Sequence, residues 1–374
     1  MPAENTSPVW FARCADYGDA SAAALGRLLA ESGLLASDTV RGKRVLVKPN
    51  LLTDRTPDEA VTTHPDALRA VLRHLKAAGA DVSVGDSPAS TANLRSVLSK
   101  SGLGAVCEEE GVPFVPFERE GVQNFTEDGF SFSLAKPVVE ADLIVNLPKV
   151  KSHSLTKLTA AVKNLYGAVP GYSKATLHRL YPKPAEFGRL LRAIWKVLPP
   201  AVTIADGIVG MEGQGPANGR PIRLGFLAAS ADPFALAGAL CRALHIRPDS
   251  VPYLKGVAAA RAPEVRGDAV DVPKKFSTPL GAHLLALVPA WLARLAAGLI
   301  WVRPQFDAAR CIACGQCVRA CPAQALTLEG RAIPLLAKKS CIGCACCHEV
   351  CPKGAIRMRP SAILRLSHAF KDLK

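Results

Sequence analysis

Residues 311–322 read CIACGQCVRACP, and residues 341–352 read CIGCACCHEVCP. Both stretches follow the spacing C-x2-C-x2-C-x3-C-P, and matching residues lie 30 positions apart. The match continues past the cysteines, since Ala325 corresponds to Ala355. Self-similarity at one fixed offset predicts a small pseudo-twofold module whose fold is built around whatever these cysteines bind.

The cysteine spacing resembles that of bacterial two-cluster ferredoxins, in which the fourth cysteine of each run binds the cluster of the other run. This resemblance implies two 4Fe-4S clusters. One takes Cys311, Cys314, Cys317 and Cys351, and the other takes Cys321, Cys341, Cys344 and Cys347. Structural zinc also uses CxxC pairs, but a zinc site needs only two such pairs and has no use for two four-cysteine runs ending in proline.

The composition fits one large domain with a small appended one. The chain has 374 residues, 49% of them hydrophobic, which is enough to bury a large core. Eight of its 12 cysteines are these assigned cluster ligands, and iron-sulfur ligands must be thiolates in a reducing environment. The first residues show neither a basic segment followed by an apolar run nor a twin-arginine signal. We therefore expect a cytoplasmic protein.

The net charge of +14 raises the question of nucleic-acid binding. Residues 303–374 hold 12 Lys and Arg against 4 Asp and Glu, and an oxidised all-cysteine cluster carries about two negative charges that offset part of this excess. No helix-turn-helix, zinc-finger or RNA-recognition motif accompanies the charge, and aromatic residues make up only 6% of the chain. We expect no nucleic-acid partner, and a redox partner protein instead.

The first 275 residues alternate apolar strands with amphipathic helices. Residues 43–52, KRVLVKPNLL, contain a buried strand, and residues 64–80, HPDALRAVLRHLKAAGA, carry leucines at helical spacing. This alternation predicts an α/β fold, a mostly parallel sheet flanked by helices. We expect three parts: the α/β domain at 1–275, an apolar helical linker or insert at 276–304, and a small α+β ferredoxin-like two-cluster domain at 305–374.

Polar side chains follow several predicted strands at the points where those strands end. In open α/β sheets, ligands bind in the crevice beyond the carboxyl ends of the strands. Polar residues also follow strands simply because loops are polar, so no single position decides between the two explanations. The side chains concerned are Lys48, Asn50, Asp86, Asn146, Lys149 and Asp206.

Residues 143–185 contain seven Lys and Arg and no Asp or Glu. Lys149, Lys151 and His153 precede a predicted helix through TKLTAAVKNLY, whose N-terminal amides favour negative charge. Lysine runs are often only solvated surface. Lys149 and Lys163, however, sit in the apolar contexts LPKV and AVKN, where burial without an anionic partner is costly. The segment indicates a site for an anionic small molecule.

Residues 206–219, DGIVGMEGQGPANG, combine glycines that permit close backbone approach with the carboxylates of Asp206 and Glu212. The order of the glycines differs from the dinucleotide-binding fingerprint, and G-x-x-x-x-G-K-[ST] occurs nowhere in the chain. A flexible surface turn is the alternative explanation. As a site, the stretch would supply acidic groups that orient cations or bind a metal.

The chain carries, in this order, VLVKPNLL, VTTHPDALRAVLRHLKAAGA, VGDSP, ADLIVNLPKVKSH, LTAAVKNLYGAVPG and DGIVGMEGQGP. This order resembles the domain of unknown function 362 family, whose members often end in a two-cluster ferredoxin module. The resemblance brings no established reaction, but it points to ten site residues. We assign catalytic roles to His153, Lys149, Lys163, Asp206 and Glu212, and cofactor-binding roles to Lys48, Asn50, His64, Asp86 and Asn164.

Residues 279–304, PLGAHLLALVPAWLARLAAGLIWVRP, form an apolar segment between the predicted domains. The segment is long enough to cross a bilayer, but Pro289 interrupts it and Arg294 would cost about 2.5–3.5 kcal/mol on insertion. A broken helical hairpin packed between the domains is one explanation. Peripheral membrane contact through residues 279–302 is the other, and it would make this cytoplasmic protein membrane-associated.

Two functional classes are compatible with these observations. In the first, the protein is an iron-sulfur oxidoreductase that passes electrons through two 4Fe-4S clusters to an anionic small molecule in the α/β domain. In the second, it is a non-catalytic electron carrier or assembly adaptor whose α/β domain binds a partner protein. A large domain with converging polar motifs exceeds what a docking surface needs, so we favour the reductase.

Overall fold

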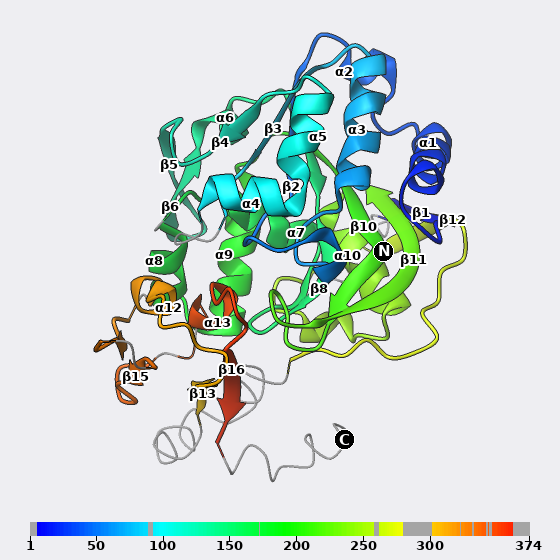
Figure 1. The fold of residues 1–374 in the computed structure, drawn as a ribbon. Helices are drawn as coiled ribbons and strands as arrows, with labels where there is room; N and C mark the ends of the chain where they lie inside the picture. The colour runs from blue at the N-terminus through cyan, green and yellow to red at the C-terminus, as the bar shows by residue number, and fades with distance from the viewer. Residues whose placement is uncertain are drawn as a thin grey trace.

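The computed structural model describes residues 6–88, 93–171, 173–257, 262–279, 301–321, 323–330, 333–341, 343 and 346–361 (Figure 1). Within these residues, a central sheet of ten strands has the order β12-β1-β11-β10-β7-β2-β3-β4, with β8 beside β10 and β9 beside β8. Its strands are β1 (Ser7–Arg13), β2 (Arg44–Pro49), β3 (Asp81–Asp86), β4 (Phe114–Pro116), β7 (Leu143–Leu147), β8 (Lys149–His153), β9 (Lys157–Thr159), β10 (Ala201–Glu212), β11 (Arg220–Ser230) and β12 (Pro263–Gly267).

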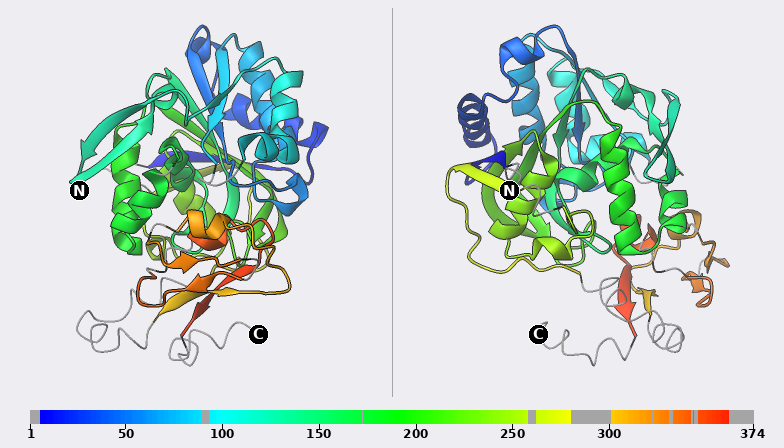
Figure 2. Two further views of the ribbon diagram at one scale, coloured as in Figure 1. Left: turned by 60° about the vertical axis from the view of Figure 1, so that its left-hand side comes forward. Right: turned by 180° about the vertical axis from the view of Figure 1, so that it is seen from behind.

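The neighbouring strands β10, β7, β2, β3 and β4 run parallel, and β11 pairs antiparallel with both β10 and β1. Helices cover both faces of the sheet (Figures 1 and 2). They are α1 (Asp19–Ser32), α2 (Ser37–Val40), α3 (Pro65–Ala77), α4 (Leu94–Ser101), α5 (Leu103–Glu109), α6 (Lys136–Val139), α7 (Ala161–Asn164), α8 (Ser173–Leu180), α9 (Pro184–Lys196) and α10 (Pro233–Ala243), with 3-10 turns η1 (Pro57–Glu59), η2 (Leu165–Ala168) and η3 (Pro248–Ser250). A separate hairpin is formed by β5 (Val122–Glu127) and β6 (Phe130–Ala135).

The sheet separates two apolar cores. One core packs residues such as Leu68 and Leu72 of α3 against the sheet, and the other packs Phe187 of α9 and Phe234 of α10. Strands buried on both faces need near-continuous apolar runs, and β10 is buried along almost all of its length. The expected mostly parallel sheet flanked by helices is therefore confirmed.

Helix α3 begins with His64 as its N-cap, at the end of the connection that follows β2. The His64 side chain accepts a hydrogen bond from the backbone N–H of Asp66 at 3.2 Å, and Pro65 occupies the first helical position. Gly79, at a φ of +82°, ends the segment in a conformation that favours glycine. His64 is thus fixed as a helix cap.

The C-terminal module consists of short elements arranged around the cysteines. β13 (Val302–Phe306) pairs antiparallel with β16 (Ile356–Pro360), and β14 (Leu326–Thr327) pairs with β15 (Leu335–Leu336). The helical turns are α12 (Gln316–Arg319) and α13 (Cys346–Glu349). In Figure 2, α12 and α13 face the α/β domain and the β13–β16 ribbon lies on the far side of the module.

The repeat predicted from the sequence is present in the backbone contacts of the module. Cys321 Sγ accepts a hydrogen bond from Ala325 N at 3.2 Å, and Cys351 Sγ accepts one from Ala355 N at the same distance. These contacts stand at corresponding positions of the two runs, which supports the pseudo-twofold arrangement.

Most of the predicted linker lies outside the described residues, which lack 280–300, so the domain boundaries at 276–304 stay predictions. Among the helices that the structure describes, none combines the length and apolar character needed to cross a membrane.

Candidate functional site

A cavity of about 100 Å³ opens beyond the carboxyl ends of β2 and β3, between β8, α7 and α8. We call it the lysine pocket, because four of its lining side chains are lysines. This is the edge of the sheet at which ligands bind in open α/β folds. The pocket is lined by Lys48, Asn50, Leu51, Leu52, Asp86, Ser87, Lys151, His153, Thr159, Lys163, Asn164, Tyr166, Gly167, Lys174, His178, Pro216, Ala320 and Val350.

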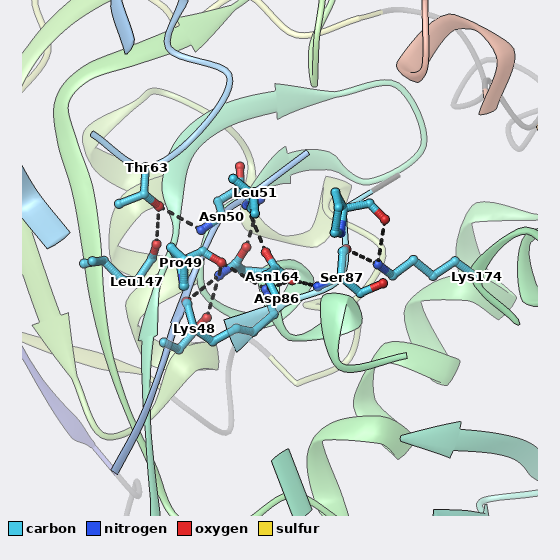
Figure 3. Close-up of polar contacts among 12 residues, drawn as sticks. Lys48, Pro49, Asn50, Leu51, Thr63, Asp86, Ser87, Leu147, Asn164 and Lys174 are labelled. Atoms are coloured by element: carbon cyan, nitrogen blue, oxygen red, sulfur yellow. Dashed lines mark hydrogen bonds and ion pairs between the residues drawn. The ribbon is translucent and has the colours of Figure 1, made fainter. Parts of the chain in front are cut away.

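A buried ion pair forms the floor of the pocket. Lys48 Nζ lies 2.8 Å from Asp86 Oδ1, and the two side chains are 1% and 2% exposed (Figure 3). Asp86 also accepts hydrogen bonds from the backbone N–H groups of Leu51 and Ser87. Burial lowers the pKa of Lys48, and the neighbouring carboxylate opposes that shift. The pair is therefore held rigidly by its surroundings.

Gly167 permits this arrangement. A Cβ atom at position 167 would lie 2.5 Å from both Lys48 Nζ and Asp86 Oδ1, closer than any side chain can approach. Position 167 thus requires glycine for steric reasons, because η2 passes directly against the ion pair.

A chain of amide side chains connects the pocket to the sheet. Asn50 Nδ2 donates to Asn164 Oδ1 at 2.9 Å, and Asn164 Nδ2 donates to Asn146 Oδ1 at 2.8 Å. Asn146 in turn donates to the Ala161 carbonyl at 2.9 Å, which ties β7 to α7. This relay orients each amide, so that Asn50 and Asn164 present defined groups to the cavity.

Three buried polar atoms at the pocket wall have no hydrogen-bond partner among the described residues. They are Asn50 Oδ1, Thr159 Oγ1 and His178 Nδ1. Buried polar atoms in native proteins are almost always satisfied. These atoms can therefore bind water or a ligand that offers hydrogen-bonding groups as well as charge.

Lysine side chains reach the pocket from three elements. Lys174 of α8 donates to the carbonyl of Ser87, and burial lowers its pKa to about 8 despite the nearby carboxylate of Asp86. Lys163 of α7 lies 4.8 Å from the ring centroid of Tyr166. Lys151 of β8 donates to the Val61 carbonyl at 2.6 Å. These cations make the cavity suited to an anion.

The two histidines at the pocket differ in what they can do. His153 Nδ1 accepts hydrogen bonds from the backbone N–H groups of Leu155 and Thr156, at 3.0 and 3.3 Å, so the proton of the neutral ring is on Nε2. His178 stacks on Phe187 at 4.5 Å, and burial lowers its pKa to about 3. His153 therefore keeps an N–H donor on Nε2, whereas burial keeps His178 neutral.

Lys149 and Asp206 do not line the lysine pocket, although the sequence placed them with Lys163. Lys149 Nζ lies 2.5 Å from Asp206 Oδ2, with both side chains fully buried. Tyr17 OH donates to Asp206 Oδ1 at 2.9 Å and accepts from Lys149 at 2.8 Å, and the His64 ring stacks on Tyr17 at 3.5 Å. Burial lowers the pKa of Lys149 and of His64. This cluster ties β8 to β10.

The separation of Lys149 from Lys151 has a cause in the strand pairing. Lys149 pairs with Asp206 and Lys151 pairs with Met211, so β10 advances five residues while β8 advances two. The irregularity separates two lysines that a regular strand would place on one face.

Glu212 also lies away from the pocket. Its Oε1 accepts from Arg220 at 2.7 Å, and its Oε2 accepts from the Ser277 backbone N–H at 2.8 Å. The carboxylate is thus engaged by groups of its own chain and fastens β11 and residue 277 to the end of β10.

Within the described residues, no set of three or more His, Cys, Asp or Glu side chains is close enough to hold a single metal ion. Four of the predicted cluster ligands nevertheless line one cavity in the module: Cys311, Cys314, Cys317 and Cys351. Ligands of a cubane sit at its separate corners, farther apart than the ligands of one ion. Four thiols around one cavity fit a 4Fe-4S cluster, and we call this group the Cys351 cage.

The ligands predicted for the second cluster are described only in part. Cys321, Cys341 and Cys347 belong to the described residues, whereas Cys344 lies outside them. Cys347 and Cys317 are both buried in one apolar cluster with Leu326 and Ile356.

The module reaches the lysine pocket through two corresponding residues. Ala320 and Val350 line the pocket, and they directly precede Cys321 and Cys351, one predicted ligand of each cluster. On the other side, Asn218 Nδ2 donates to the His348 carbonyl at 3.0 Å and Arg55 donates to the Cys351 carbonyl at 3.3 Å. These contacts hold the cysteine runs beside the cavity.

Several residues of the pocket were absent from our sequence assignment. Lys151 and Lys174 were visible as charges of the acid-free stretch 143–185, but nothing in the sequence separated them from solvated lysines. Thr159 and Tyr166 gave no signal at all. The six assigned residues that do line the pocket are Lys48, Asn50, Asp86, His153, Lys163 and Asn164.

Comparison with known proteins agrees with an α/β domain followed by a cysteine-containing module. Residues 45–242 match the domain of unknown function DUF362, and residues 305–358 match a 4Fe-4S dicluster domain. The chain is 38% identical over 234 residues to the thylakoid-associated protein sll1697 of Synechocystis sp. (strain ATCC 27184 / PCC 6803 / Kazusa). The aligned region covers 62% of this chain and 72% of that protein.

Two solved structures show distant similarity to the chain. The lactate racemase apoprotein from Thermoanaerobacterium thermosaccharolyticum matches with a TM-score of 0.39 and 14% identity, over 62% of this chain and 56% of its own. A protein from Thermotoga maritima matches with a TM-score of 0.35 and 13% identity, over 58% and 57%. The chain thus spans little more than half the length of either. From its matches to family models and to the cyanobacterial relative, the chain belongs to the DUF362 family and carries a C-terminal 4Fe-4S domain.

Proposed function

We propose that the protein is an iron-sulfur oxidoreductase that reduces a small anion bound in the lysine pocket. The observation that carries this proposal is the presence of Ala320 and Val350 in the pocket wall, each one residue from a cluster cysteine. Two 4Fe-4S clusters would supply single electrons from a redox partner protein. A ligand in the pocket would lie beside both cysteine runs, whereas a simple electron carrier has no need of a cavity there.

The lining of the pocket defines the class of ligand. Lys163 and Lys174 would bind a carboxylate or phosphate. Asn50 Oδ1 requires a hydrogen-bond donor, such as a hydroxyl or amine of the ligand. The Thr159 hydroxyl can pair with either a donor or an acceptor. We therefore expect a small anion that also carries a hydroxyl, amine or carbonyl group, rather than an apolar molecule.

A two-electron reduction consumes two electrons from the donor protein and two protons, and both protons would come from solvent. The neutral His153 ring, whose proton is on Nε2, would donate a hydrogen bond that orients the reacting group of the ligand. Lys48, Asp86, Asn50 and Asn164 would position the ligand.

The remaining assigned residues take supporting roles in this proposal. Lys149, Asp206 and His64 would fix β8 and α3, and Glu212 would fix β11, because their polar atoms contact groups of the chain itself. They would act on the site by holding the strands from which Lys151 and His153 project.

Anaerobic purification followed by native mass spectrometry and electron paramagnetic resonance tests the proposal. A co-purifying small anion that is lost in a Lys163→Ala and Lys174→Met double variant, with unchanged cluster spectra, would support it. An empty pocket together with a stoichiometric protein partner would replace it with the electron carrier or adaptor.

A Cys317→Ser variant tests the number of clusters and their ligands. We expect loss of the cluster held by the Cys351 cage and retention of the other, read from the iron content and the resonance spectrum. Unchanged spectra in this variant would overturn the ligand assignment.

Association with a membrane surface is part of the proposal. The relative is described as thylakoid-associated, and residues 279–302 provide an apolar segment. A segment of this kind can lie in the headgroup region without spanning the bilayer.

A further inference from the structure

The two helical turns of the module end on residues of opposite charge. α12 ends at Arg319 and α13 ends at Glu349, and these residues correspond to each other at the offset of 30. Each lies two residues before the fourth cysteine of its own run. The pseudo-twofold repeat is therefore broken in its charge.

Arg319 contacts the Cys351 cage directly. Its Nη2 donates to the carbonyl of Cys314 at 3.2 Å, and Cys314 is one of the four cysteines of the cage. Gly315 leaves room for this contact, because a Cβ atom there would lie 3.0 Å from Arg319 Nη1. No carboxylate among the described residues lies within ion-pair distance of the guanidinium. The guanidinium thus lies beside the cage without a carboxylate partner among those residues.

Lys353 adds a second cation to the same cage. It lines the cavity of the four cysteines, and the corresponding position in the other run is Ala323. Arg55 also donates to the Cys351 carbonyl, but Glu59 lies 2.6 Å from it and offsets its charge. Arg319 and Lys353 therefore supply the excess positive charge beside the Cys351 cage.

Lysines near the other run do not cancel this difference by contact. Lys338 and Lys339 precede Cys341 and are exposed, and within the described residues neither makes a hydrogen bond or ion pair. Exposed charges without contact are strongly screened by solvent, so contact rather than the count of charges decides the local field.

We infer that the two clusters differ in reduction potential and that the cluster in the Cys351 cage has the higher one. Positive charge favours the reduced cluster, which carries one more negative charge than the oxidised one. The first electron taken up by the protein therefore resides in the Cys351 cage, next to Val350 in the pocket wall. This inference rests on the proposed presence of two clusters.

An anaerobic redox titration of the full chain, followed by electron paramagnetic resonance, tests the inference by charge exchange. The unmodified chain should show two separate one-electron steps. We call the reduction at the higher potential the upper step and the other one the lower step. Arg319→Glu should move the upper step to a lower potential, and Glu349→Arg should move the lower step to a higher potential. The double exchange should narrow the gap most. Lys338→Glu is the matched control and should leave the upper step in place.

The outcomes separate this inference from the proposed function. An iron content of about four rather than eight atoms per chain would overturn the two-cluster proposal itself. About eight iron atoms with a single common potential would overturn only the inference. If Arg319→Glu loses iron, Arg319→Gln replaces it, and an unmoved upper step in that variant also rejects the inference. Because Arg319 is exposed, the expected shifts shrink as salt is raised.

Discussion

Replacing Lys149 by Met should destabilise the α/β domain far more than removing a surface lysine. Lys149 Nζ lies 2.5 Å from Asp206 Oδ2, and neither side chain is exposed. Removing one partner of such a pair costs about 3–5 kcal/mol, because the other charge stays buried without compensation. Asp206 keeps hydrogen bonds from Tyr17 and from the His64 backbone, so we expect a loss near the lower end, about 3 kcal/mol.

Urea unfolding of the full chain under anaerobic conditions, followed by far-ultraviolet circular dichroism, measures this loss. With a slope of about 3 kcal/mol per M, the midpoint should fall by about 1 M. The matched control is Lys183→Met, because the Lys183 side chain is 77% exposed and its ion pair with Glu186 is long, at 3.6 Å. We expect the control to stay within about 0.5 kcal/mol of the unmodified chain.

A double variant separates the charge from the packing. Lys149→Met with Asp206→Asn removes both charges and retains similar volumes, so it should recover most of the lost stability. The reasoning fails if Lys149→Met alone stays within about 1 kcal/mol of the unmodified chain, or if the double variant is no more stable than the single one. Retained stability with lost turnover would return Lys149 to the catalytic group.

Three further predictions concern the lysine pocket and the membrane, with sulfate as the anion probe because its charge is constant above acidic pH. Gly167→Ala places a methyl group 2.5 Å from Lys48 Nζ and Asp86 Oδ1, so it should abolish sulfate binding in calorimetry and leave the cluster spectra intact. Sulfate affinity should fall as pH rises through about 8, because Lys174 is protonated below that pKa and neutral above it, and Lys174→Met should remove this dependence. Vesicles of anionic lipid should float the full chain but not a variant lacking residues 279–302.

Each of these predictions has a control and a contrary result. Gly238→Ala matches Gly167→Ala, because a Cβ atom at Gly238 meets nothing closer than 3.9 Å and should leave binding unchanged. Lys183→Met should keep the pH dependence that Lys174→Met removes. Tight sulfate binding by Gly167→Ala, a flat pH profile in the unmodified chain, or equal flotation of both chains would each contradict the corresponding prediction.

Much of the fold was predictable because its signals are local. The apolar runs of β2, β7 and β10 and the leucine spacing of α3 indicated buried parallel strands with covering helices. The two cysteine runs predicted a doubled module because cluster ligation requires fixed short spacings along the chain.

The site was predictable only in outline. Lys48 and Asp86 lie at the carboxyl ends of β2 and β3, and Asn50 directly follows β2, so the carboxyl-edge rule placed them together correctly. Lys149 and Asp206 satisfied the same rule and yet lie in a different cluster, because the register between β8 and β10 shifts between the Lys149–Asp206 pair and the Lys151–Met211 pair. A register shift depends on two strands far apart in sequence and leaves no mark in either one.

The sequence by itself determined the family, the α/β class and the cysteine pattern of a 4Fe-4S domain, because each is written in residues close together along the chain. Only the tertiary structure decided which lysines share a cavity and that Ala320 and Val350 form part of its wall. Small apolar residues such as these carry no chemical signal. Their importance comes from position alone, and position beside the lysine pocket exists only after the module has packed against the sheet.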